Sequence, residues 1–568
     1  MKRRLLLWLL CAALVITLPS ATPNCRAASA RASGGMVATV HPAATDAGVR
    51  ALRQGGNAID AAVAAALTLG VVDSHNSGLG GGCFMIIRLA DGTIAALDGR
   101  EIAPARATRD MYLRDGKPQP SLSQTGPLAS GVPGALAAHD YALRHFGRLK
   151  LRDLLLPAAE IAEKGFIINK AQAGSFRRFG KAESTSPGLK AVLLKADGSA
   201  YQSGERFKQP DLARTYRAIA EQGPDWFYKG PFARTVGKWM ADNGGIITAD
   251  DFAGYSARRR APVVSTYRRY TVVGFPPPSS GGVHVAQILN ILEHFDLGML
   301  YRTDRARAYH IIAEAMKLAF ADRVYWLGDP GFAKVPRGLI DKKYAAELAA
   351  RIDPDKVTPV TGHSQPPRAG TDLFGRRHTT HIAAVDGRGN WVGITATINT
   401  GFGSKVVVPG TGLVLNNEMD DFSIAPGVPN SAGLLGAEAN AVEPGKRPLS
   451  SMSPTIVLDD GRPIMTVGAA GGPTIITQVV MAIVGRLDFG LDLTAALAGP
   501  RIHHQWRPDQ LKAQTSLGPE IIDSLKQRGH DVLSVKGIGI TQAIALSADG
   551  KCFVGVHDPR VPGKAAGP

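Results

Sequence analysis

The chain has 568 residues, of which 45% are apolar and 20% are charged. This balance is typical of a globular protein with a large buried core and excludes a wholly disordered chain. The formal net charge is +17, but the basic residues are scattered and are not interleaved with aromatic side chains. We therefore expect no nucleic-acid partner and interpret the charge as favouring solubility, with attraction of anionic substrates as a secondary effect.

The N-terminus has the pattern of a signal peptide. Lys2, Arg3 and Arg4 precede an apolar run over 5–18, and the small residues Ala28-Ser29-Ala30 follow. The run is short for a membrane span, so an uncleaved anchor is the weaker alternative. We expect residues 1–30 to be removed and the mature protein to be periplasmic or secreted, with no stable membrane span.

Beyond this segment the chain keeps two cysteines, Cys83 and Cys552. In an exported protein they could form a disulfide, which the sequence does not decide. No Cys-x-x-Cys spacing is present, and the adjacent His503 and His504 would point to opposite faces of a strand. We therefore expect no metal site.

Periodicity and breaker residues predict alternating helices and strands and no internal repeat. The second helix is rich in alanine, which indicates close packing against a sheet. The predicted helices are 46–54 (capped by Asp46), 57–69, 135–145, 283–294, 306–321 and one from about 474; the predicted strands are 84–88, 93–97, 379–385, 391–399 and 465–467.

The sharpest boundary lies directly before Thr379. Residues 353–377 are rich in proline and glycine, end in Arg376-Arg377-His378, and give way at once to a strand pattern. A cut before Thr379 would place a free α-amine, with a pKa of about 8, beside the Thr379 hydroxyl. An amine of this kind can accept the hydroxyl proton and activate a threonine nucleophile. The alternative is an ordinary dibasic protease site at Arg376-Arg377 without catalysis.

The two strands after this boundary form a predicted hairpin. Its link, 386–390, has turn chemistry, and a hairpin symmetric about Arg388 would set the register, which a one-residue slip would change. Alternation along the second strand places Thr395, Thr397 and Asn399 on one face. The predicted pairs are Val385 with Trp391, Ala383 with Gly393, His381 with Thr395, and Thr379 with Thr397.

Three further segments carry candidate chemistry. Residues 468–472 are glycine-rich and precede a helix, so they either expose N–H groups to an oxyanion or form only a tight turn. Residues 449–454 place hydroxyls in a loop. Residues 416–421 (Asn-Asn-Glu-Met-Asp-Asp) suit an ammonium group, and the alternatives are a solvated acidic turn or a calcium site.

Taken together, these segments resemble the γ-glutamyltranspeptidase family in order and spacing, from about Met36 to Pro559. The motifs that carry the resemblance are Thr379-Thr380-His381, Asn399-Thr400, the run 415–422, the run 448–454, Gly471-Gly472, and, earlier in the chain, Gly55-Gly56-Asn57-Ala58, the run 78–82, Asp98-Gly99-Arg100-Glu101 and Gly131-Val132-Pro133-Gly134.

The resemblance implies an α/β fold of the N-terminal-nucleophile type, an αββα sandwich. It implies autocatalytic cleavage between His378 and Thr379 into subunits 31–378 and 379–568, which associate as a heterodimer. The implied roles are Thr379 as nucleophile, Thr397 as its positioning residue, Gly471 and Gly472 as oxyanion hole, Arg100, Ser450 and Ser451 as ligands of the substrate α-carboxylate, and Asn399, Glu418 and Asp421 as ligands of its α-ammonium.

The implied activity is hydrolysis or transfer of γ-glutamyl groups from glutathione and other γ-glutamyl amides, through an ester on Thr379, without a cofactor. Water, amino acids and dipeptides would be the acceptors. The sequence departs from the family pattern at Ile382-Ala383, at Pro473-Thr474 and at Ala432 in the lid segment 426–446. The alternatives are a glutaryl or cephalosporin acylase of the same fold, or an uncleaved, non-catalytic exported binding protein.

Overall fold

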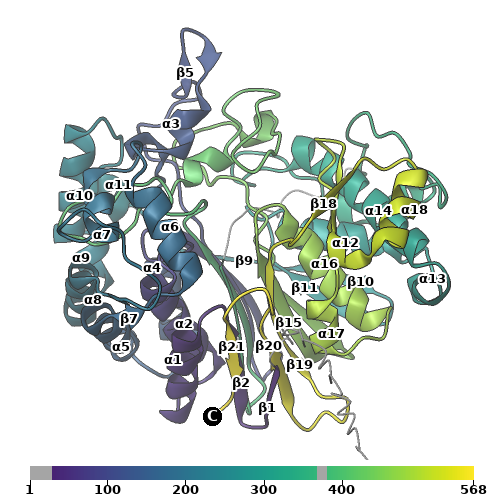
Figure 1. Ribbon diagram of the computed structural model, residues 1–568, viewed down its shortest axis with the longest axis horizontal. Helices are drawn as coiled ribbons and strands as arrows, with labels where there is room; N and C mark the ends of the chain where they lie inside the picture. The colour runs from purple at the N-terminus through teal and green to yellow at the C-terminus, as the bar shows by residue number, and fades with distance from the viewer. Residues whose placement is uncertain (1–28, 368–379) are drawn as a thin grey trace, which may run out of the picture.

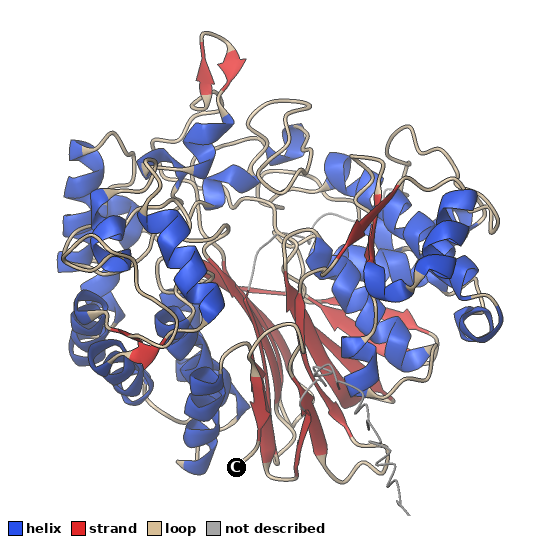
Figure 2. Ribbon diagram, in the orientation of Figure 1, coloured by secondary structure: helices blue, strands red, loops and turns tan. Residues whose placement is uncertain are grey.

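The computed structural model describes residues 29–367 and 380–568. Two seven-stranded antiparallel sheets lie face to face at its centre, and helices cover their outer faces (Figures 1 and 2). The first sheet has the order β1 (Ser29–Ala32), β20 (Phe553–Val556), β19 (Ile540–Leu546), β15 (Arg462–Ala470), β14 (Thr455–Asp459), β11 (Tyr270–Gly274) and β10 (Val263–Tyr267). The second has the order β21 (Lys564–Ala566), β2 (Gly35–Thr39), β12 (Thr380–Asp386), β13 (Trp391–Thr397), β3 (Gly82–Arg88), β4 (Ile94–Gly99) and β9 (Arg258–Arg260).

Each sheet has its own helical layer. The layer on the first sheet contains α12 (Gly281–Leu292) and α16 (Thr474–Leu487), which contact its strands, and α14 (Arg305–Trp326), which packs against α12. The layer on the second contains α1 (Pro42–Arg53), α2 (Ala58–Val72) and α4 (Ala135–Phe146), which contact its strands, α5 (Leu151–Lys164), which packs against α2, and α8 (Pro210–Gln222), which packs against α5. A third apolar cluster, which includes Phe84, Phe275 and Ile456, fills the space between the sheets. The layers are therefore αββα, as predicted.

Shorter elements surround this sandwich. The helices are α3 (Pro120–Gln124), α6 (Lys170–Gly180), α7 (Pro187–Leu193), α9 (Pro224–Tyr228), α10 (Pro231–Asp242), α11 (Ala249–Ala253), α13 (Leu297–Thr303), α15 (Lys342–Ala349), α17 (Leu493–Ala498) and α18 (Pro519–Gln527). The strands are β5 (Leu113–Arg114), β6 (Lys117–Pro118), β7 (Phe166–Ile167), β8 (Arg206–Phe207), β16 (Ile502–His503), β17 (Leu511–Gln514) and β18 (Val532–Val535). No helix within the described residues is long and apolar enough to cross a membrane.

The first two helices show how local sequence sets element boundaries. In α2 every residue is buried, and Asn57 and Asp60 form a capping box at its start, which confirms the predicted packing of an alanine-rich helix on a sheet. The predicted start of α1 at Asp46 is wrong. Its N-cap is His41, whose ring accepts a hydrogen bond from Ala43 N, and Pro42 occupies the first helical position.

The central hairpin of the second sheet has the predicted register. His381 pairs with Thr395, Ala383 with Gly393, and Val385 with Trp391. The Asp386 carboxylate accepts hydrogen bonds from the backbone N–H groups of Arg388 and Asn390 (2.9 and 3.1 Å), which fixes the turn. Thr379 lies outside the described residues, so the fourth predicted pair stays a prediction.

Two predicted boundaries at the ends of strands are wrong. Strand β13 ends at Thr397, and Asn399 has a positive φ of 72°, so it leaves the face predicted for it. Strand β15 continues through Gly468, where a loop was predicted, to Ala470. Gly468 belongs in this strand because a β-carbon there would lie 2.4 Å from Nδ1 of the buried His381 ring. The glycine thus permits close packing of the two sheets.

Substitution of Gly468 by alanine should destabilise the fold by about 1–3 kcal/mol, the usual cost of adding a methyl group to a fully packed core. Thermal unfolding should show a lower Tm than that of the wild type. The matched control is Gly174→Ala in α6, where nothing lies within 4 Å of the added carbon. Since alanine is the better helix former, this control should be neutral or stabilising. Equal Tm values for both variants would contradict the packing argument.

Candidate active site

Several candidate residues lie at one end of neighbouring strands in the second sheet. Strands β4 and β13 are both antiparallel to β3, so they run in the same direction and end together. Gly82, the first residue of β3, pairs with Thr397, and the next residue, Cys83, pairs with Gly99. Arg100 and Asn399 therefore emerge from strand ends on either side of β3. Cys83 itself is a free thiol, as is Cys552.

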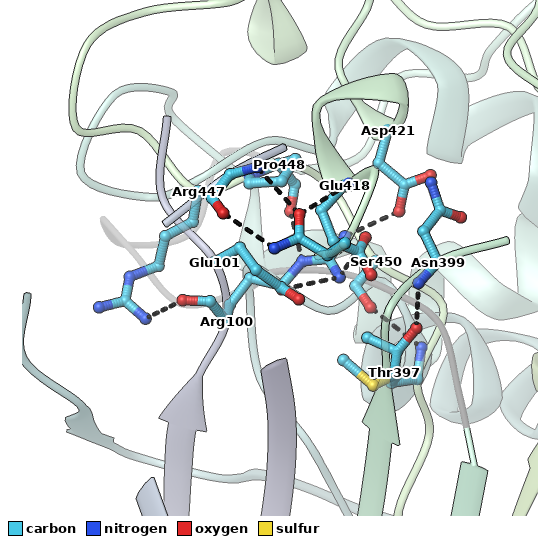
Figure 3. A network of polar contacts seen from close by, with 12 residues as sticks. Arg100, Glu101, Thr397, Asn399, Glu418, Asp421, Arg447, Pro448 and Ser450 are labelled. Carbon is cyan, nitrogen blue, oxygen red and sulfur yellow. Dashed lines mark hydrogen bonds and ion pairs between the residues drawn. The ribbon is translucent and has the colours of Figure 1, made fainter. Parts of the chain in front are cut away.

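Arg100 is completely buried and lies at the centre of a polar network (Figure 3). Its Nη1 is 2.7 Å from Oε2 of Glu418, and its Nη2 is 2.7 Å from Oδ2 of Asp421. Oε2 of Glu101 is 3.5 Å from Nη1. The Nε–H group donates to the carbonyl oxygen of Pro448 at 3.2 Å. One guanidinium thus faces three carboxylates.

Burial shifts the pKa values of two of these acids, Glu101 and Glu418. Burial raises the pKa of Glu101 to about 8, although Arg100 opposes the shift. Burial likewise raises the pKa of Glu418 well above its usual range, against Arg100. A second cation in contact with these acids would stabilise their ionised forms. The network is therefore suited to a ligand that carries an ammonium group.

The acidic run 416–421 is held by a buried asparagine. Oδ1 of Asn416 accepts from the N–H groups of Gly131 (2.9 Å) and Glu418 (3.0 Å), while Nδ2 donates to the carbonyls of Gly80 and Gly131 (both 2.8 Å). The glycine motifs near residues 80 and 131 thus support the acidic run. Glu418, Asp420 and Asp421 are all buried, so the alternative of a solvated acidic turn is wrong.

Within this run, Asp420 does not take part in the Arg100 network. Its Oδ1 accepts from the Ser123 hydroxyl at 2.8 Å, and its Oδ2 from Ser431 N at 2.9 Å. The two acids named as ammonium ligands, Glu418 and Asp421, are those that face Arg100.

Thr397 and Asn399 border the network. The Thr397 hydroxyl oxygen accepts from Asn399 N at 2.7 Å, and the Asn399 side chain donates to the carbonyl of Asn417 at 2.9 Å. Figure 3 shows both residues beneath Glu418 and Asp421. Thr397 is fully buried, whereas Asn399 is half-exposed. Asn399 is thus the more exposed of these two residues.

Ser450 and Ser451 are also fully buried, in the segment that follows Pro448. The Ser450 carbonyl accepts from both the N–H and the hydroxyl of Ser280, at 2.9 and 2.6 Å, and Ser450 N donates to Pro278 O. The Ser450 hydroxyl oxygen accepts from Met452 N. The segment is thus fixed against the start of α12, on the side of Arg100 where Pro448 lies.

Gly471 and Gly472 lie between β15 and α16, with φ values of 130° and 66° that favour glycine. The Gly471 carbonyl accepts from the Thr474 hydroxyl at 2.6 Å, and the Gly472 carbonyl accepts from Ile475 N at 3.0 Å. Within 29–367 and 380–568, no hydrogen bond joins them to the Arg100 network. The remaining candidates, His378 and Thr379, lie outside the described residues.

A second buried ion pair, which sequence reasoning missed, supports Arg100. Arg447 Nη1 contacts Asp98 Oδ1 at 2.7 Å, and Arg260 contacts the other oxygen of Asp98 at 2.6 Å. Tyr255 donates to the backbone carbonyl of Arg100 at 2.7 Å. Asp98 belongs to a motif noted in the sequence, and Arg447 directly precedes another, the run 448–454, but neither residue was singled out. Asp73, at the end of α2, was also missed, and its carboxylate accepts from the Thr380 hydroxyl at 3.2 Å.

The fold, together with the polar network at the ends of β4 and β13, indicates the class of protein. A solved cephalosporin acylase from Bacillus halodurans superposes with a TM-score of 0.85 at 29% identity, over 98% of this chain and 99% of that one. Together with the αββα layers, this match identifies an N-terminal nucleophile hydrolase fold.

The family follows from the sequence comparisons. A family model described as Gamma-glutamyltranspeptidase matches residues 44–568, and the chain belongs to this family of enzymes. It is 44% identical to the glutathione hydrolase proenzyme of Escherichia coli (strain K12), over 93% of this chain and 91% of the relative. It is 39% identical to the acylase ACY 1 proenzyme of Pseudomonas sp. (strain SE83), over 93% and 92%. The predicted fold and family are confirmed.

The raised pKa of Glu101 predicts a pH-dependent contribution to stability. Its folded value of about 8 lies above the value of about 4.3 expected in the unfolded chain. Between these values the folded state binds more protons, so stability falls as pH rises. Glu101→Gln removes this titration, and its Tm relative to wild type should therefore increase from pH 5 to pH 8. Glu347→Gln, an exposed residue of α15, is the control. Parallel pH profiles for wild type and Glu101→Gln would contradict the shift.

Proposed function

We propose that this enzyme hydrolyses or transfers γ-glutamyl groups from glutathione and related γ-glutamyl amides. The observation that carries the proposal is the buried network of Arg100 with Glu418 and Asp421. A guanidinium matches a carboxylate, and paired acids match an ammonium. This is the chemistry that an α-amino acid head group requires.

In this proposal the head group enters the network as a zwitterion. Its α-carboxylate binds Arg100 and the hydroxyls of Ser450 and Ser451. Its α-ammonium binds Glu418, Asp421 and the side-chain oxygen of Asn399, and supplies the positive charge that the three carboxylates lack. Because these groups are withdrawn from water, the charge-assisted contacts are stronger than at a surface.

The proposed nucleophile is Thr379, freed by autocatalytic cleavage between His378 and Thr379. Two observations support it. The register of β12 against β13, continued by one residue, would pair position 379 with Thr397, and curated relatives are named as proenzymes. The mature subunits would then comprise residues 31–378 and 379–568.

The reaction proceeds in two acyl transfers. The Thr379 hydroxyl attacks the γ-carbonyl carbon while the free α-amine takes its proton, and the N–H groups of Gly471 and Gly472 stabilise the oxyanion. The C–N bond breaks, the leaving amine receives that proton, and a γ-glutamyl ester remains on Thr379. Water then releases glutamate, or an amino acid or dipeptide amine takes the γ-glutamyl group and restores the hydroxyl.

We further propose export to the periplasm or the exterior, directed by the N-terminal segment. Most of that segment, 1–28, lies outside the described residues. Strand β1 begins at Ser29 and pairs with β20 at the edge of the first sheet. Signal removal after Ala28 would preserve the whole strand, whereas removal after Ala30 would delete half of it.

Thr379→Ala should abolish both cleavage and activity, because one hydroxyl serves both acyl shifts. The purified variant should run as one band on a denaturing gel, and the wild type as two, with Thr379 at the N-terminus of the smaller band. Arg377→Ala, which destroys the dibasic site, should still be processed. Normal processing of Thr379→Ala, or loss of processing in Arg377→Ala, would favour cleavage by another protease.

Asp421→Asn should lower kcat/KM for γ-glutamyl 4-nitroanilide by about tenfold or more, since loss of a charge-assisted contact costs about 1.5–3 kcal/mol. Glutaryl 4-nitroanilide lacks the ammonium and should lose much less. Asp420→Asn is the matched control, because Asp420 is equally buried but faces Ser123 and Ser431. Equal losses on both substrates for Asp421→Asn would favour the acylase alternative.

A further inference from the structure

Lys405 is a half-buried lysine near the candidate site, and the proposed reaction has so far given it no role. It follows β13 in the loop 398–405, where its Nζ donates to the Thr400 hydroxyl oxygen at 3.1 Å and to the Gly403 carbonyl. Its Nζ also lies 5.3 Å from the centre of the Phe179 ring, which belongs to α6. Lys405 N donates to Phe402 O at 2.8 Å, and its carbonyl accepts from Ser186 N at 3.0 Å, so the residue is held in place.

No carboxylate forms an ion pair with Lys405 in the part of the chain that the structure describes. Asp420 is the acid whose charge acts on it, but both oxygens of Asp420 already accept hydrogen bonds from Ser123 and Ser431. Arg178, stacked on the same Phe179 ring, repels it. Lys405 is half-buried, and its Nζ hydrogen bonds go to neutral oxygens, so a carboxylate bound beside it would gain a charge-assisted contact. A bound carboxylate would therefore supply the negative charge that is missing among the hydrogen-bond partners of Lys405 Nζ.

Lys405 is connected to the candidate site through one residue. Thr400, its hydrogen-bond partner, also donates its N–H and hydroxyl to Asn417 Oδ1, each at 3.1 Å. The residue before it, Asn399, contacts Thr397. Residues 399–401 are half-exposed, and a β-carbon on Gly401 would lie 3.4 Å from the Phe179 ring. Lys405 and Phe179 therefore lie beside the half-exposed segment 399–401, which follows the end of β13 at the candidate site.

We propose that Lys405 binds a carboxylate of the leaving group, and of the acceptor that replaces it, so that the enzyme prefers γ-glutamyl amides of amino acids and short peptides to those of neutral amines. The inference rests on the proposed γ-glutamyl activity. An amino acid or dipeptide released from, or added to, the γ-glutamyl group carries one free carboxylate. The Phe179 ring supplies an apolar wall next to that charge.

The test compares substrates that differ only in this carboxylate. One pair is γ-glutamyl 3-carboxy-4-nitroanilide and γ-glutamyl 4-nitroanilide, and another is glutathione and its C-terminal amide. For each pair we measure the ratio of kcat/KM for the anionic to the neutral substrate. Wild type should prefer the anionic member, and Lys405→Met should reduce the ratio about tenfold, as expected for loss of a charge-assisted contact. The matched control is Lys181→Met, an exposed lysine at the end of α6, which should keep the wild-type ratio.

The pH dependence of the same ratio provides a second readout. Burial lowers the pKa of Lys405 to about 8, with Asp420 raising it and Arg178 lowering it. On the remaining side, His75, paired with Asp73, packs against the neighbouring Phe402. Lys405 is charged below its pKa, so the preference for the anionic substrate should be full near pH 6.5 and decline as pH rises through about 8. Titration of the catalytic amine affects both substrates and cancels in the ratio.

Lys405→Arg keeps the charge and does not titrate in this range, so its preference should persist at pH 9. If Lys405→Met does not fold, the wild-type pH profile and Lys405→Arg still decide the question. A ratio that is unchanged in Lys405→Met, or flat with pH in wild type, would overturn the subsite. Failure of wild type to cleave γ-glutamyl 4-nitroanilide would instead overturn the proposed function itself.

Discussion

A guanidinium buried without any solvent contact must be balanced by negative charge, and Arg100 sets this requirement for the surrounding structure. Glu418, Asp421 and Glu101 supply the charge, and Asn416 and the glycine loops hold the acidic run in place. Loss of Arg100 would leave buried carboxylates without their cation in a medium of low polarity, which costs about 3–5 kcal/mol. The network is therefore a structural element as well as the proposed binding site.

The sandwich makes this arrangement possible because it brings distant segments to one edge. Four segments, 98–101, 397–399, 416–421 and 447–451, each leave or approach the same end of the second sheet. Asp98 and Arg447 in these segments are 349 positions apart in the chain. The Arg447–Asp98 pair, itself buried, fixes the strand end from which Arg100 emerges. The proposed specificity for an amino acid head group thus depends on sheet register as much as on the side chains that would touch it.

Much of this could be predicted from the sequence where local chemistry decides the outcome. The turn at 386–390 and strict alternation fixed the hairpin register, and the motif residues around Arg100, Glu418 and Asp421 were recognised as site candidates. The start of α1 was missed because His41 is an unusual cap. Gly468 appeared to be a loop residue because the reason for it, the His381 ring on the opposing sheet, is a tertiary contact. Arg447 was missed for the same reason, since its partner Asp98 is 349 positions away in the chain.

Each of the two central sheets combines strands from before residue 368 with strands from after residue 379. Strands β2 and β3, from before residue 368, flank β12 and β13, from after residue 379, and β1 borders β20 in the other sheet. A fragment ending before β12 would have a gap two strands wide in the middle of a sheet. Two separately translated halves would therefore have to meet before either could complete its core. Synthesis as one polypeptide solves this assembly problem, and a cut made after folding leaves the partners held by backbone hydrogen bonds along several strands.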